Sequence, residues 1–275
     1  MEATRDMNVV IVNFRTPKLT TRCVSSLLER DIAQAENVVV VDNASPDDSY
    51  RQLRQHLPQP VRLLHPYMNR GFGAGVNFGI AACLHRFVLV LNPDTYVIDS
   101  SIEKAIEVMK ARAEVGLVGL ELTYPNGERQ YSARRFYSML DIVGRRTPLG
   151  KLDLLHERMA RHLMMEAWNP GVPFDADWVM GAGFIVRRAL YEELGGMDEM
   201  YFLFMEDVDL CARIWQAGYR VACVPGARLV HEHQRASAQG PLTSAARHHL
   251  HSLLRFSKKF RVPLAWPPGL HRLQR

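Results

Sequence analysis

The stretch Val38-Val39-Val40-Val41-Asp42-Asn43-Ala44-Ser45 decides the fold, because an uninterrupted run of valines leads directly into an acid. The same pattern occurs where Phe87 to Leu91 leads into Asn92-Pro93-Asp94-Thr95. Such runs predict strands that are buried on both faces, as in a parallel sheet. Ligands of open α/β sheets bind at the carboxyl ends of such strands. We therefore expect the two acids on the edge of one crevice, where carboxylates suit a hard metal ion and a diphosphate.

Strands and helices alternate through the first part of the chain. Strands are predicted over 8–12, 38–41, 61–64 and 87–91. Helices are predicted over 17–30, after residue 45, and over 72–84 and 100–112. This alternation predicts an α/β protein with a parallel sheet and right-handed crossovers.

The second part of the chain is less regular. Strands are predicted over 115–122, 178–186, 220–224 and 228–230, and helices over 206–216 and 248–260. A basic, Met-rich insertion is predicted over 134–168. We expect one domain over 1–235, with halves that meet near residue 115, followed by a basic helical extension over 236–275.

Composition indicates a globular protein of a reducing compartment. The chain has 275 residues, of which 47% are hydrophobic, and no run reaches the roughly 20 apolar residues of a membrane-spanning helix. The four cysteines follow no zinc or redox spacing, and the first residues lack the pattern of a signal peptide. We therefore expect a cytoplasmic protein.

The net charge of +5 is concentrated beyond about Arg228, where basic residues greatly outnumber acids. A basic tail favours an anionic partner such as lipid headgroups, diphosphates or nucleic acid. A solvated helix face explains the same charges equally well.

Two acidic motifs follow the buried strands. In Asn92-Pro93-Asp94 a stiff turn holds a carboxylate that could serve as a metal ligand, although an Asx-turn that ends the strand gives the same residues. Asp42 could accept a hydrogen bond from a nucleobase or a ribose hydroxyl. A turn that caps the following helix is the alternative interpretation of Asp42.

The glycine-rich segment over 69–77 follows one predicted strand and opens a helix. It nearly matches a dinucleotide fingerprint, which would indicate a dinucleotide-dependent oxidoreductase, but Val76 stands at the third glycine position and the segment follows the third strand. A loop whose backbone approaches a nucleotide or diphosphate is the other interpretation.

A dense acidic group, Glu206-Asp207-Val208-Asp209, begins a predicted helix after an aromatic run. Acids at this position complement the helix macrodipole. Apolar surroundings could also raise the pKa of one carboxylate into the range useful for a general base. Further along, His231 follows a strand, where it could bind a metal or serve a structural purpose.

Taken in order, these motifs resemble an inverting family 2 glycosyltransferase of the GT-A fold, in the bacterial branch that includes rhamnosyltransferases of cell-wall and O-antigen assembly. The matching segments are 9–14, 40–45, 69–73, 91–95, 181–184, 195–199, 204–210 and 230–231. The resemblance implies a Rossmann-like, mixed and mostly parallel sheet flanked by helices. It also implies that the domain of 1–235 has a nucleotide-binding half (about 1–115) and an acceptor half (about 116–235).

The resemblance further implies roles for individual residues. Those of the nucleotide pocket are Asn13, Phe14, Asp42, Asn43, Asn69, Gly71 and Asn92. Asp94 and His231 would hold the metal and diphosphate, with Asn92 in place of the first acid of a DxD motif. Asp207 would be the catalytic base, with Glu206 orienting either Asp207 or the acceptor. The sugar or acceptor pocket would be lined by Trp178, Gly181 and Ala182.

The reaction implied is transfer of a sugar from a dTDP- or UDP-sugar, such as dTDP-rhamnose, to a glycan or lipid-linked acceptor in cell-surface polysaccharide synthesis. A carboxylate would take the acceptor proton, and Mg²⁺ or Mn²⁺ would neutralise the leaving diphosphate. The basic tail could rest on the inner face of the membrane, pack against its own domain or form a homodimer, and we expect no nucleic-acid partner. A non-catalytic nucleotide-sugar-binding module of the same fold is a further alternative.

Overall fold

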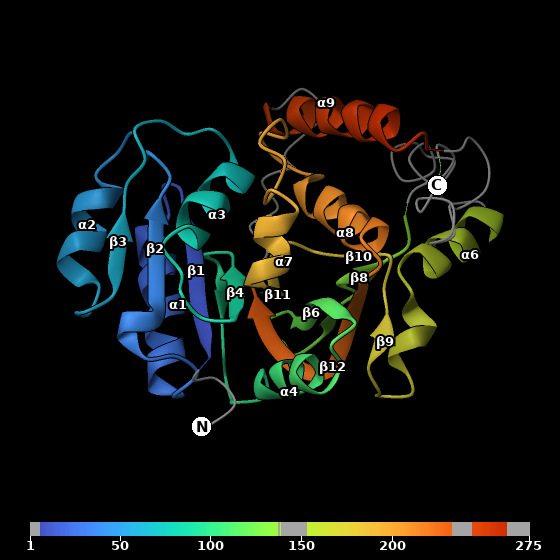
Figure 1. Ribbon diagram of the computed structural model, residues 1–275, viewed down its shortest axis with the longest axis horizontal. Helices are drawn as coiled ribbons and strands as arrows, with labels where there is room; N and C mark the ends of the chain where they lie inside the picture. Colours follow the sequence, from blue (N-terminus) through green and yellow to red (C-terminus); the bar gives the residue numbers. More distant parts are fainter. Residues whose placement is uncertain (1–5, 137, 139–152, 233–243, 263–275) are drawn as a thin grey trace.

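The computed structural model describes residues 6–136, 138, 153–232 and 244–262. The predicted insertion over 134–168 and the predicted extension over 236–275 lie partly outside these residues. Within them, one large sheet forms the centre of the molecule and helices cover both of its faces (Figure 1).

The large sheet has ten strands, of which eight follow one another in the order β3-β2-β1-β4-β11-β6-β12-β5. These eight are β1 (Met7–Asn13), β2 (Val38–Asp42), β3 (Arg62–Leu64), β4 (Phe87–Leu91), β5 (Thr95–Tyr96), β6 (Val115–Thr123), β11 (Gly183–Arg187) and β12 (Arg220–His231). Two short strands pair at its margin, β7 (Arg129–Gln130) with β6 and β9 (Phe174–Asp175) with β12. A separate small sheet joins β8 (Ala133–Arg134) to β10 (Trp178–Val179).

The carboxyl ends of the strands that run parallel to β1 lie at one edge of the sheet. β1, β2, β3 and β4 are mutually parallel. β11 is antiparallel to both β4 and β6, and β12 is parallel to β6. β6 and β12 therefore run in the direction of β1, so the predicted mixed, mostly parallel α/β sheet is confirmed.

Alternation along the strands divides the core between the two faces. Val9 and Ile11 of β1 belong to one buried cluster, and Val10 and Val12 belong to the other. The first face is covered by α1 (Pro17–Glu29), α2 (Ser49–His56) and α4 (Glu103–Ala111). The second is covered by α3 (Phe72–Ile80), α7 (Arg188–Glu193), α8 (Glu206–Gln216) and α9 (Ser244–Lys259). The other described helices are α6 (Asp153–His162) and the 3₁₀ turns η1 (Ala35–Asn37) and η3 (Met165–Trp168).

Glycines let α3 lie close to the sheet. A Cβ at Gly79 would stand 2.5 Å from Cγ1 of Val10, and a Cβ at Gly75 would stand 2.8 Å from Cγ1 of Val12. The glycine-rich composition of α3 is therefore explained by helix-on-sheet packing.

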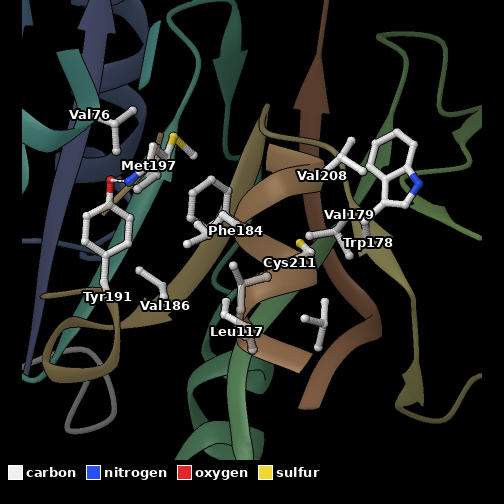
Figure 2. Packing of buried hydrophobic residues seen from close by; sticks show 14 of the residues in the cluster. Val76, Leu117, Trp178, Val179, Phe184, Val186, Tyr191, Met197, Val208 and Cys211 are labelled. Atoms are coloured by element: carbon white, nitrogen blue, oxygen red, sulfur yellow. Dashed lines mark hydrogen bonds between the residues drawn. The ribbon is translucent and has the colours of Figure 1, made fainter. Parts of the chain in front are cut away.

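Helix α8 packs on the sheet through buried apolar side chains (Figure 2). Val208 and Cys211 of α8 are buried in the same cluster as Phe184 and Val186 of β11. In the same cluster, the backbone N–H of Met197 donates to the hydroxyl of Tyr191 at 3.1 Å. The acidic start of α8 therefore stands on a well-packed support.

The structure corrects three predicted elements. The strand predicted over 178–186 is two strands, β10 and β11, because residues 180–182 leave the small sheet and turn into the large one. The strands predicted over 220–224 and 228–230 form the single strand β12, which has a register shift between Val224 and Arg228. The helix predicted over 248–260 begins earlier, at Ser244.

Two further observations concern the expected compartment. All four cysteines are buried and free. Within the described ranges, no helix combines the length and apolarity that crossing a bilayer requires. A cytoplasmic location stays a prediction.

Candidate active site

The predicted site residues gather at the carboxyl edge of the sheet. Asn13 and Asp42 are register partners at the ends of β1 and β2. Asp94 lies in the turn between β4 and β5, and His231, which ends β12, pairs with Thr95 of β5. The strand order therefore brings the two acidic motifs and the histidine to one edge.

The carboxylate of Asp42 is fully buried and engaged. It accepts hydrogen bonds from Nδ2 of Asn13 at 2.7 Å, from Oγ of Ser45 at 2.6 Å and from Nδ1 of His65 at 2.9 Å. These bonds make Asp42 an organiser of the first loops of the site. Direct contact between Asp42 and a nucleoside would require His65, whose side chain is 40% exposed, to turn away, so that role stays a prediction.

Three other predicted nucleotide-binding residues, Asn43, Asn69 and Gly71, form a hydrogen-bonded loop cluster. Nδ2 of Asn43 donates to Oδ1 of Asn69 and to the carbonyl of Gly71, and Oδ1 of Asn69 accepts the N–H of Gly71 at 2.8 Å. Phe14 follows β1 with 43% of its surface exposed. Its exposed ring is a possible stacking surface for a nucleobase.

Contact with the protein's own backbone explains why a glycine is needed at position 71. Its φ is +102°, and a Cβ there would stand 2.2 Å from the carbonyl oxygen of Phe202. The same carbonyl accepts the N–H of Phe72 at 3.1 Å. The close approach predicted at this loop is therefore made by the segment before α8, and approach of a ligand to Gly71 stays a prediction.

Asp94 and His231 form a paired donor set. Nε2 of His231 lies 3.5 Å from Oδ1 of Asp94. Nε2 of Gln130 donates to the carbonyl of His231 at 2.7 Å, which directs Oε1 of Gln130 to Nδ1 of His231 at 2.8 Å. Nδ1 must then carry the proton, and Nε2 faces the carboxylate.

This donor set fits a divalent cation that is shared with a substrate. No group of three or more His, Cys, Asp or Glu side chains in the described part of the chain is arranged to hold a metal. Mg²⁺ is commonly held by only one or two carboxylates together with water and substrate phosphates. An oriented imidazole nitrogen beside one carboxylate therefore meets the requirement for a site completed by a diphosphate.

Asp207 lies in the first turn of α8, half-buried, with its carboxylate held by backbone N–H groups. The N–H of Gly181 donates to Oδ2 at 2.8 Å, and the N–H of Val208 donates to Oδ1 at 2.8 Å. Burial raises the pKa of Asp207 above its ordinary value, while these N–H groups and the Arg134 guanidinium oppose the rise. The result is a fixed carboxylate that is more basic than an exposed one.

Glu206, the neighbouring acid, is placed differently. It is 5% exposed, and its Oε2 has no hydrogen-bond partner within the described residues. Burial and the adjacent Asp207 raise the pKa of Glu206 well above its ordinary value. This environment favours the protonated form of Glu206 more than an exposed site would, and Asp207 is the better candidate for a base.

The turn between β10 and β11 connects the two acidic sites. The N–H of Gly181 binds Asp207, and the carbonyl of Ala182 accepts the N–H of Asn92 at 3.0 Å. The loop that bears Asp94 and the helix that bears Asp207 are thus tied to adjacent residues. Trp178 is buried in the core, where its indole N–H donates to the carbonyl of Arg135 at 2.9 Å, and a place for Trp178 in the sugar pocket stays a prediction.

Most of this chain is similar in sequence to known proteins. The family model described as "Glycosyltransferase like family 2" matches residues 5–249. The N-acetylglucosaminyl-diphospho-decaprenol L-rhamnosyltransferase of Mycobacterium tuberculosis H37Rv is 29% identical over 245 residues, which cover 84% of this chain and 78% of the relative. The rhamnosyltransferase WbbL of Escherichia coli K12 is 26% identical over 203 residues, which cover 70% of this chain and 72% of the relative.

Solved structures support the same fold. The mannosyltransferase PcManGT from Pyrobaculum calidifontis, in complex with GDP-Man and Mn²⁺, aligns with a TM-score of 0.65 at 18% identity and covers 98% of this chain and 69% of its own. GalNAc-T7 with UDP, GalNAc and Mn²⁺ aligns with a TM-score of 0.63 at 17% identity, covering 92% of this chain and 47% of its own.

Proposed function

Because the chain belongs to glycosyltransferase family 2, we propose that it is a metal-dependent inverting enzyme that moves a sugar from a nucleotide sugar to an acceptor hydroxyl. The observation that carries the proposal is the Asp207 carboxylate, which the N–H of Gly181 holds at 2.8 Å beside the loop of Asn92 and Asp94. With this family membership, the oxidoreductase interpretation of the glycine-rich segment is wrong.

Asp207 is the general base of the proposed reaction. Inversion by a single displacement requires the acceptor hydroxyl to lose its proton as it attacks the anomeric carbon, and a positioned carboxylate contributes roughly 10²–10⁴ in rate. The raised pKa of Asp207 increases its basicity, and the two N–H bonds keep it oriented. The raised pKa of Glu206 disfavours a second negative charge near the attacking oxygen.

Asp94 and His231 hold the metal and diphosphate in the proposal, with Gln130 orienting the imidazole. When bound, Mg²⁺ or Mn²⁺ supplies a Lewis acid that neutralises the charge of the departing diphosphate. Two structural neighbours, PcManGT and GalNAc-T7, are complexes with Mn²⁺, which supports a divalent cation in the proposed site.

The proposed donor is a dTDP- or UDP-sugar, with dTDP-rhamnose first. Two curated relatives are named rhamnosyltransferases, and the mycobacterial one is named for a lipid-linked sugar diphosphate acceptor. By analogy, we take the acceptor to be a glycan or lipid-linked saccharide of cell-surface polysaccharide synthesis.

Donor binding gives the first test. Calorimetric titration of dTDP and UDP with Mn²⁺ should give binding to the wild-type protein that chelation of the metal weakens. In Asp94→Ala the metal-dependent part of the affinity should disappear, whereas metal-free affinity should remain. Undiminished metal-dependent affinity in Asp94→Ala would remove Asp94 from the proposed site.

A peripheral contact with the inner face of the membrane is the proposed setting of the reaction. The outer side of α9 exposes Arg247, Leu250, His251, Leu254 and Lys258, and α9 contains no acid. Apolar side chains flanked by cations suit an anionic bilayer surface. We name these five residues the outer stripe of α9. A homodimer through this stripe stays a prediction.

A further inference from the structure

The segment that leads into α8 has an unusual backbone. Phe204 has a φ of 67° and Met205 has a φ of 73°, so two successive non-glycine residues occupy the left-handed region. Met205, the N-cap of α8, has no side-chain hydrogen bond that caps the helix. Such a conformation persists only where the surrounding structure determines it. Asp207 follows two residues later, so its carboxylate depends on whatever holds this segment.

Helix α9 lies along this strained segment. Oγ of Ser252 donates to the carbonyl of Leu203 at 2.9 Å. The ring of His248 stacks on Phe202 with centroids 4.6 Å apart, and the ring of His249 packs against Phe204 with centroids 4.8 Å apart.

The same helix is anchored to the core and to α8. Leu253 and Phe256 are buried in the cluster that contains Met205 and Val208. In Figure 1, α9 lies across the end of the molecule next to α8.

Lys259 joins the end of α9 to the acidic motif itself. Its Nζ donates to Oδ1 of Asp209 at 2.5 Å and to Oδ2 of Asp198 at 2.8 Å. Asp209 is fully buried, and its other oxygen accepts Nε of Arg213 at 2.6 Å. Asp209 therefore fixes the first turn of α8 between one cation of its own helix and one from α9.

We infer that α9 is a positioning element for Asp207, with Lys259 and Ser252 as positioning residues. The match to the family model ends at residue 249, so ten residues of the helix, 250–259, lie beyond it. The basic extension then contributes to catalysis through α9, separately from any membrane contact of the outer stripe. This positioning role rests on the proposed role of Asp207 as base.

Lys259→Met tests the inference in the full-length protein. Both ion pairs are lost while an unbranched apolar side chain of similar size remains, so kcat should fall by about 10- to 100-fold, the cost of a small misplacement of a reacting group. The KM for the nucleotide sugar should stay at its wild-type value, because the donor side lies at the ends of β1, β2 and β4. Lys259→Arg should restore kcat, and Lys104→Met, a change of an exposed lysine in α4, should leave kcat unchanged.

A second variant protects the test from a folding defect. Ser252→Ala removes one hydrogen bond to the strained segment, and it should lower kcat in the same direction by a smaller factor. A double variant gives the most specific readout. Because Lys259 acts through Asp207, adding Lys259→Met to Asp207→Asn should lower the residual kcat no further.

The outcomes separate two possible failures. Wild-type kcat in Asp207→Asn would contradict the proposed base. Loss of kcat in Asp207→Asn, with wild-type kcat in both Lys259→Met and Ser252→Ala, would leave the base in place and overturn the positioning role. A fully additive double variant would also overturn it, because Lys259 would then act independently of Asp207.

Discussion

Two neighbouring acids, Glu206 and Asp207, differ because their hydrogen-bond partners differ. The carboxylate of Asp207 receives two backbone N–H groups, which favour its charged form. Oε2 of Glu206 receives none within the described residues and is buried, which favours its neutral form. One sequence motif thus places two carboxyl groups in different environments.

Glu206→Gln should therefore retain most of the wild-type kcat, because Asp207 is the proposed base and glutamine has nearly the same shape as the glutamate it replaces. Steady-state transfer assays check this expectation. If Glu206→Gln loses as much activity as Asp207→Asn, then Glu206 is ionised in the working enzyme and shares the role of the base.

The same variant should change the dependence of stability on pH. The pKa of Glu206 is raised in the folded protein above the ordinary value of 4.5. Stability is therefore lost as pH rises from the unfolded pKa through the folded pKa. Glu206→Gln should raise the unfolding midpoint at pH 8 and change it little at pH 4, as measured by thermal denaturation. An equal shift at both pH values would contradict a raised pKa of Glu206 in the folded protein.

At the residue scale, the sequence revealed acids that follow apolar runs and missed their partners. Asp42, Asp94 and Asp207 were identified by their position after buried strands or at a helix start. Gln130 was missed because it meets His231 across 101 positions of the chain. His65 was missed for the same reason, since a single histidine after a short strand gives no signal of a bond to Asp42.

At the element scale, Gly71 joins α3 to the segment before α8. Gly71→Ala should destabilise the protein more than Gly127→Ala, as measured by urea denaturation. Both glycines have positive φ, +102° and +86°, so each variant should cost about 1–2 kcal/mol of left-handed strain. Only at Gly71 would the new Cβ also meet backbone, at 2.2 Å from the carbonyl oxygen of Phe202. Equal losses of unfolding free energy would show that the contact with Phe202 is unimportant.

Strands that are buried on both faces, such as β2 and β4, have a continuous apolar run in the sequence, and this run predicts them. Prediction failed where tertiary contacts decide the outcome. The strand is interrupted between β10 and β11 because Ala182 binds Asn92 and Gly181 binds Asp207. Neither contact is local in sequence. The bulge within β12 likewise reflects pairing with β6.

At the scale of the whole molecule, α9 has two different sides. Its inner side is packed into the core, while the outer stripe exposes Leu250 and Leu254 among cations. Deleting the tail would therefore disturb the segment before α8 as well as any membrane contact. Substitutions on the outer stripe are the sharper test of the membrane contact.

Leu250→Glu combined with Leu254→Glu should reduce cosedimentation with vesicles that contain phosphatidylglycerol, and high salt should reduce that of the wild type. Leu84→Glu, a change of a leucine that is 83% exposed outside α9, serves as the control. Neither the double variant nor the control should change the rate of transfer to a water-soluble acceptor. Wild-type sedimentation of the double variant would contradict a membrane contact through the outer stripe.

The central claim is that Asp207 takes the acceptor proton, and its most direct test is the kcat of Asp207→Asn with a cognate nucleotide sugar and acceptor. We predict a fall of about 10²–10⁴-fold, with nucleoside diphosphate affinity retained. Asp31→Asn, the same change at an exposed aspartate, should keep the wild-type kcat. A wild-type kcat in Asp207→Asn would contradict the account.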